Sequence, residues 1–173
     1  MDARITVMDL TIRKFLYGHL KPLHDEVDQM AGAYDLSTGT GRNEFLSFLA
    51  HGFCAVETAV ERAAPRLIGA DVGSRMRRQH LPAIPTIKDV VLETEGEVWG
   101  GLYVLEGSRL GGKVIARQTA ALAHHPFFKP DPPRHWQGFL EQLTQADERL
   151  NDRDGMLRGA TSSFEAFVKS PQW

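Results

Sequence analysis

Hydrophobic residues in this chain recur mostly at intervals of three and four, the spacing of one face of an α-helix. The pattern is clearest between residues 8 and 31, where Pro22 interrupts it. Because proline lacks a backbone donor and clashes one turn back, we expect either a kink near Gly18 or a second helix with Pro22 in its first turn. The apolar positions of this segment are Met8, Ile12, Phe15, Leu16, Leu20, Leu23, Val27 and Met30.

The same spacing predicts further helices along the chain. A Gly, Ser and Thr-rich loop at 35–42 precedes a helix that we expect Asn43 to cap and Pro65 to end. We expect a short helix near 74–80, another capped by Thr86, a connection at 125–133, and two last helices at about 135–150 and 155–169. No segment shows sustained period-two alternation, so residues 1–173 are predicted to form a single all-α domain of six to eight helices.

Residues 93–123 lack proline and contain the stretch Tyr-Val-Leu-Glu-Gly-Ser-Arg-Leu-Gly-Gly-Lys-Val-Ile at 103–115. It can be read as a strand, a glycine loop and a helix, or as one glycine-rich helix. The spacing Gly107-x-x-x-Gly111-Gly112 matches neither the dinucleotide fingerprint nor the phosphate loop. No alternating strand and helix pattern surrounds it, so one long helix is the favoured interpretation.

Four glycines of that segment share one helical face. Gly96, Gly100, Gly107 and Gly111 fall at roughly 0°, 40°, 20° and 60° on a helical wheel. Each costs about 0.8 to 1 kcal/mol relative to alanine inside a helix. Bare backbone is useful where another helix packs unusually close or where a flat ligand lies against it, and periodicity alone leaves both uses open. The glycines at 107, 111 and 112 also predict a bend.

Composition narrows the classes of function. The chain has 173 residues, 42% of them hydrophobic, and a formal net charge of −2. The only basic run, 75–78, is interpreted as a solvated helix face, so no nucleic-acid or membrane partner is predicted. The single cysteine, Cys54, lies in an apolar run and is expected to be an inert thiol in a reducing, cytoplasmic location. No apolar stretch is long enough to span a membrane.

A metal bound to a flat ligand on the glycine face requires a protein ligand, and histidine is the obvious residue type. Of seven histidines, three near the proline-rich connection and His80 are expected at the surface, and His51 in the core; His19 and His24 remain. His24 has Asp28 four residues later, close enough to orient its ring. No histidine has an Asp or Glu three residues away, and no Cys/His cluster exists, so di-iron and zinc sites are not predicted.

The segment Leu102–Ile115 resembles the distal-helix motif of haem oxygenases, especially the small bacterial members associated with bacteriophytochromes. The segment Leu23-His24-x-x-Val27-Asp28 is similar to their proximal-histidine motif. Residues 45–57 resemble a second conserved block. Trp136-x-x-Phe139-Leu140 and Ala160-x-x-x-Phe164-x-x-Phe167 resemble the C-terminal helices. The resemblance covers most of the chain in the same order.

The resemblance implies a multi-helical fold in which haem lies between a proximal helix and a kinked, glycine-rich distal helix. His24 would be the axial iron ligand, and Gly107 and Gly111 would let the distal backbone approach the porphyrin. Haem would be both cofactor and substrate, cleaved with O2 and electrons from an external reductase or ferredoxin to biliverdin, CO and Fe2+. Expected partners are the electron donor and a bacteriophytochrome that receives biliverdin.

Several positions depart from the family pattern. Many members carry an acid where this chain has Ser108, so proton delivery would use Ser108, backbone and water. A basic residue that often pairs a haem propionate is replaced by Tyr17; Arg13 and Lys21 lie on nearly the same helical face as His24 and could substitute. Tyr103 in the distal motif is also expected to contact the cofactor. The sequence leaves open whether Arg109 points to a propionate or to solvent.

Two other functions remain open from sequence. A protein with this fold could hold haem or another tetrapyrrole without degrading it. Alternatively, the glycine face could serve only to pack helices.

Overall fold

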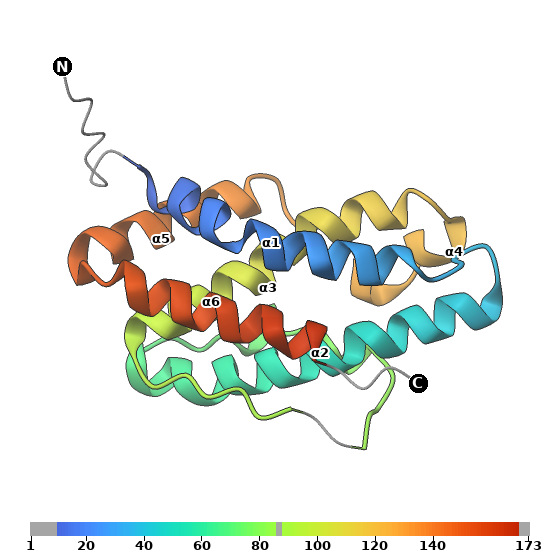
Figure 1. Cartoon of the computed structure of the whole chain (residues 1–173), viewed down its shortest axis with the longest axis horizontal. Helices are drawn as coiled ribbons and strands as arrows, with labels where there is room; N and C mark the ends of the chain where they lie inside the picture. Colours follow the sequence, from blue (N-terminus) through green and yellow to red (C-terminus); the bar gives the residue numbers. More distant parts are fainter. Residues whose placement is uncertain (1–9, 86–87, 170–173) are drawn as a thin grey trace.

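A computed structural model describes residues 10–85 and 88–169, and these form an all-helical domain (Figure 1). No strand occurs within these residues, so the predicted fold class is confirmed. The α-helices are α1 (Ile12–Gly32), α2 (Gly39–Leu67), α3 (Glu95–Ala116), α4 (Ala120–Ala123), α5 (His135–Leu150) and α6 (Arg153–Val168). Three 3-10 turns join them: η2 (Gly73–Arg75), η3 (Arg78–His80) and η4 (Pro126–Phe128).

The first two helices differ from their predicted limits. α1 continues through Pro22, so no second helix starts there. α2 begins at Gly39, four residues before Asn43, because the Thr38 hydroxyl accepts a hydrogen bond from the Gly41 amide at 3.0 Å. A Cβ at Gly41 would lie 2.1 Å from the Asp35 carbonyl oxygen, so glycine is needed in this first turn. Pro65 does not end α2, which runs on to Leu67.

The glycine-rich segment is helical throughout, and the phosphate-loop interpretation is wrong. α3 begins at a capping box, in which Thr94 and Glu97 each bind the other's backbone amide. It ends at Ala116, short of the predicted Ala123, and α4 follows separately. The bend predicted at its glycines stays a prediction. The short helix expected at 74–80 is instead the two turns η2 and η3, and Met8 and Thr86 lie outside the described residues.

α6 packs along α3 and separates it from α1, which packs mainly on α6 and only marginally on α3. The approach of α3 and α6 is very close. A Cβ at Gly100 would lie 2.0 Å from the Met156 carbonyl oxygen, and one at Gly159 would lie 2.1 Å from that of Glu97. Alanine cannot occupy either position without moving backbone. Part of the glycine face therefore packs helices.

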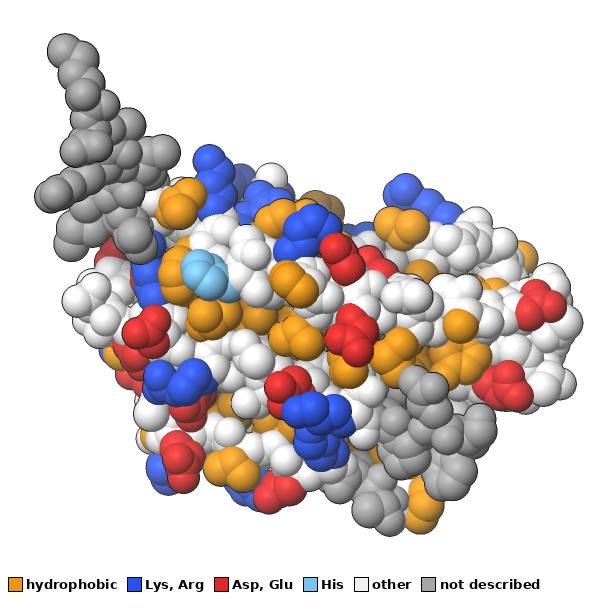
Figure 2. Space-filling view, viewed as in Figure 1, with side chains coloured by type: hydrophobic (Ala, Val, Ile, Leu, Met, Phe, Trp, Pro, Cys, Tyr) orange, Lys and Arg blue, Asp and Glu red, His pale blue; other side chains and the backbone are white. Residues whose placement is uncertain are grey.

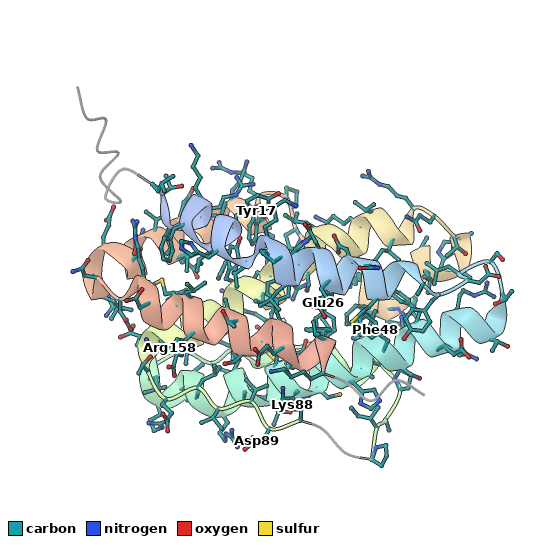
Figure 3. All side chains as sticks on the ribbon, in the orientation of Figure 1. Tyr17, Glu26, Phe48, Lys88, Asp89 and Arg158 are labelled. Atoms are coloured by element: carbon teal, nitrogen blue, oxygen red, sulfur yellow. The ribbon has the colours of Figure 1, made fainter. Side chains whose placement is uncertain are left out.

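Aromatic and aliphatic residues fill the interior between α1, α2 and α6, and Figure 3 shows Phe48 in this region. Its ring lies 5.7 Å from that of Tyr34 and 6.3 Å from that of Phe167. On the face seen in Figure 2, charges of both signs are interspersed with apolar side chains. None of the helices in the described ranges is both long and apolar enough to cross a bilayer.

Candidate functional site

A cavity of about 250 Å3 lies among α1, α2, α3, α5, α6 and η4. Its lining is mostly aromatic and aliphatic, which suits a flat apolar ligand. Half-buried and exposed residues of α1 and α3 line it as well, so it opens to solvent between these two helices. The aromatic side chains of the lining are Tyr17, Phe48, Phe53, Tyr103, Phe127, Phe128, Trp136, Phe164 and Phe167.

α1 contributes His24 to the cavity. Its Nδ1 lies 3.2 Å from an Asp28 carboxylate oxygen, as the spacing of four residues predicted. The ring packs edge-on against Phe164, with centroids 6.0 Å apart, and the side chain is 51% exposed. Because Asp28 engages Nδ1, Nε2 is the nitrogen left to bind a metal.

Most of the other predicted α1 residues lie on the same wall. Arg13, Tyr17 and Asp28 line the cavity together with His24. Lys21 does not; its ammonium group forms an exposed ion pair with Asp25 at 2.6 Å. His19, the other histidine left open by the sequence, also lies outside the cavity, and its Nδ1 is 2.8 Å from the Phe15 carbonyl oxygen.

On α3, bare backbone lines the cavity at Gly107 and Gly111. A Cβ at Gly111 would meet no atom within 4 Å, and one at Gly107 would come no closer than 3.8 Å to Trp136. Neither glycine is therefore required for helix packing. By contrast, Gly96 packs against Asp152, the N-cap of α6, and Gly100 packs against α6 itself, so the predicted four-residue glycine face divides into a packing half and a cavity half.

Ser108 and Tyr103 line the cavity beside these glycines. The Ser108 hydroxyl donates to the Leu105 carbonyl at 2.5 Å and accepts from Arg77 Nη2 at 2.9 Å. Burial raises the pKa of the Tyr103 phenol, so this group stays protonated at neutral pH.

Sequence reasoning missed Arg77, because the run Arg75–Arg78 is not a solvated face. The backbone amides of Arg77 and Arg78 donate to the Glu57 carboxylate at 2.8–3.0 Å, and the Arg78 side chain also pairs with Glu61. Glu57 is only 1% exposed, and burial raises its pKa. A carboxylate inside the core needs such hydrogen-bond donors, so the basic segment packs against Glu57 and does not extend into solvent.

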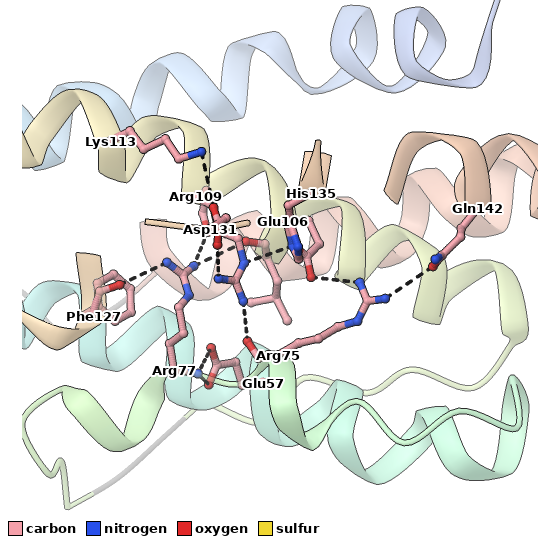
Figure 4. Close-up of polar contacts among 12 residues, drawn as sticks. Glu57, Arg75, Arg77, Glu106, Arg109, Lys113, Phe127, Asp131, His135 and Gln142 are labelled. Carbon is pink, nitrogen blue, oxygen red and sulfur yellow. Dashed lines mark hydrogen bonds and ion pairs between the residues drawn. The ribbon is translucent and has the colours of Figure 1, made fainter. Parts of the chain in front are cut away.

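A second buried carboxylate, Glu106 of α3, organises a larger network (Figure 4). It pairs with Arg75 Nη1 at 3.1 Å, with Arg109 Nε at 3.0 Å and with His135 Nε2. Arg109 also binds Asp131 at 2.7 Å, so it points to neither the cavity nor solvent. His135 was expected at the surface but is partly buried here, because its ring pairs with Glu106.

The signal for this network was the presence of glutamates at apolar helical positions, Glu57 after Val56 and Glu106 after Leu105. Their partners come from distant segments, so no local pattern could have named them. No group of three or more His, Cys, Asp or Glu side chains placed to hold a metal occurs within residues 10–85 and 88–169.

Comparison with curated proteins finds one partial relative. Over 81 residues the chain is 40% identical to a protein named "Heme oxygenase" from Xanthomonas campestris pv. campestris (strain 8004). The match covers 43% of this chain and 49% of that protein, so it spans about half of the relative's length. No family model matches the chain, and no solved structure matches it significantly. The similarity supports a relationship to haem oxygenases over the matched region.

Proposed function

We propose that this chain is a haem oxygenase, which cleaves haem to biliverdin, CO and Fe2+ with O2 and electrons from a reductase or ferredoxin. One observation carries the proposal. A single cavity brings together His24 on α1 and bare backbone at Gly107 and Gly111 on α3, two helices that hardly touch each other. The partial match to a protein named "Heme oxygenase" agrees with it.

The residues present fit a haem. The cavity has an aromatic lining, and the space beside Gly111 that a Cβ would fill is open. One imidazole nitrogen is free to bind iron, and the other is held by a carboxylate, which fixes the ring and raises the basicity of the ligand. Bound haem supplies both the iron that activates O2 and the porphyrin carbon that is oxidised.

The protein's own groups then hold and orient the haem. His24 Nε2 is the iron ligand, and Asp28 fixes its ring. Gly107 and Gly111 let α3 lie close to the porphyrin face. Ser108 holds water on that side with the oxygen lone pair that Arg77 leaves free.

The rim of the cavity has its own roles in this proposal. Arg13 and Tyr17 lie at its exposed edge, where charged propionates would reach solvent. Tyr103 contacts the cofactor from the α3 side. Lys21, held by Asp25 outside the cavity, is left out of the proposed propionate site. We also propose that the protein is cytoplasmic and that it delivers biliverdin to a bacteriophytochrome.

The first test is a haemin titration of the purified chain. We expect a stoichiometric Soret band, lost or strongly weakened in His24→Ala. His19→Ala is the matched control, because this histidine lies on the same helix but outside the cavity. If the wild type gives no Soret band, both haem oxygenase and haem carrier functions are wrong.

The second test separates the enzyme from the carrier. Reductant and O2 are added to the haemin complex, and the visible spectrum is followed. Turnover should remove the Soret band and produce the absorption of biliverdin together with CO. A Soret band that persists without biliverdin would identify a carrier.

A further inference from the structure

Arg77 is a partly buried cation whose guanidinium contacts only neutral groups. Nη2 donates to the Ser108 hydroxyl at 2.9 Å and to the Leu105 carbonyl at 3.5 Å, and Nη1 donates to the Phe127 carbonyl at 3.4 Å. Nε is buried without a partner. Within the described ranges no carboxylate pairs with this side chain, unlike the neighbouring arginines.

The carboxylates nearest to Arg77 are already committed. Glu57 binds backbone amides and Arg78, while Glu106 and Asp131 pair with Arg109. Burial, assisted by the charge of Arg109, lowers the pKa of Arg77 to about 10. The side chain therefore remains a cation at neutral pH, although its positive charge is not directly neutralised.

Arg77 lies between the cavity and an open hollow on the other side, which it lines together with His80 and Arg109. Its guanidinium lies over the Phe127 ring at 4.5 Å and the Phe53 ring at 5.1 Å, and both rings line the cavity. Its shortest hydrogen bond reaches Ser108, which lines the cavity from α3. The charge thus lies directly behind the wall formed by these residues.

We propose that Arg77 is a positioning residue whose charge, behind this wall, favours a small anionic ligand bound in the cavity on the side away from His24. This inference rests on the proposed haem site, since the haem iron is what holds such a ligand there. Ser108 donates its only proton to Leu105 and accepts from Arg77, so its hydroxyl holds the guanidinium in place, and the charge of Arg77 acts on the cavity directly.

The test compares an anionic with a neutral ligand. Azide and imidazole are titrated into the ferric haemin complex of the full chain, and their affinities are read from the Soret shift. In Arg77→Met we expect azide to bind on the order of tenfold more weakly, which is about 1.4 kcal/mol, with imidazole affinity changed less than about twofold. Arg77→Lys keeps the charge and should retain most of the azide affinity.

The variants are expected to fold, because Glu57 binds the backbone amide of residue 77 and not its side chain. Arg149→Met is the matched control: it removes an exposed arginine that pairs with Glu95 at the opposite end of α3, and it should change neither affinity.

Each outcome decides between the proposals. An unchanged azide to imidazole ratio in Arg77→Met, or equal loss in Arg77→Lys, overturns the role of Arg77 and leaves the haem site standing. Absence of haemin binding in the wild type overturns the proposed function and this inference together.

Discussion

Replacing Gly111 by alanine should raise the stability of the ligand-free protein and weaken haem binding. The residue lies inside α3, where alanine is preferred over glycine by about 0.8 to 1 kcal/mol. A Cβ at this position would meet no atom within 4 Å, so no steric cost offsets that gain. For a chain of this length, 1 kcal/mol raises Tm by about 2–4 °C. Thermal unfolding followed by circular dichroism measures this effect.

The same methyl group should oppose haem, because it occupies space that the proposed site gives to the porphyrin face. Overpacking a fitted site by one carbon costs about 1 to 3 kcal/mol, or roughly a 5- to 150-fold rise in Kd. Haemin titration measures this rise in Kd. The control is Gly138→Ala in α5, where a Cβ also meets nothing within 4 Å and which lies outside the cavity.

Both glycine variants should therefore show a similar rise in Tm, but only Gly111→Ala should bind haemin more weakly. If Gly111→Ala binds haemin as tightly as the wild type, the porphyrin does not lie against α3 at this position. If it lowers Tm, the open space beside Gly111 is not present in the ligand-free protein.

Three further predictions concern stability. Gly100→Ala should lower the free energy of unfolding in urea by about 3 kcal/mol or more, since its Cβ would lie 2.0 Å from the Met156 backbone; an unchanged midpoint would contradict the close packing of α3 and α6. Burial opposes ionisation of Glu97, but two backbone amides and Arg158 lower its pKa, so its contribution is present above about pH 4.3 and lost as pH falls through the folded pKa. Glu97→Gln should thus be less stable than wild type at pH 7, with a gap in Tm that closes as pH falls through the lowered pKa of Glu97, and a pH-independent gap would refute this origin. Glu106→Gln leaves two partly buried arginines without this carboxylate and should cost about 3 to 5 kcal/mol in urea unfolding, so a loss below 1 kcal/mol would show that the network contributes little.

The all-helical fold was predictable because apolar spacing reflects burial of one helix face. It located α5 at His135–Leu150 as observed and α6 to within two residues of each end. Helix starts were less predictable where glycine was involved. Gly41 reads as a loop residue, but it is required by the close approach of the Asp35 carbonyl, a contact that periodicity does not contain.

The candidate site was predictable in part for a similar reason. The pairing of His24 with Asp28 depends only on helical geometry and appears in the structure. Arg77 was missed because its contacts to Ser108 and Leu105 join residues 31 and 28 positions apart. Such contacts exist only after η2, η3 and α3 are packed together, so a basic run appeared to be an ordinary solvated surface.

The width of the cavity follows from the different contacts made by the two halves of α3. At its N-terminal half, Gly100 brings α6 into backbone contact, and α6 in turn supports α1. Phe164 of α6 lies 6.0 Å from the His24 ring, so the histidine is positioned relative to α3 through α6 and not by direct contact. The cavity can thus stay open between α1 and Gly111 without a ligand to separate them. Alanine at Gly100 would shift α6, and His24 with it, so a residue that does not line the cavity should still affect haemin affinity.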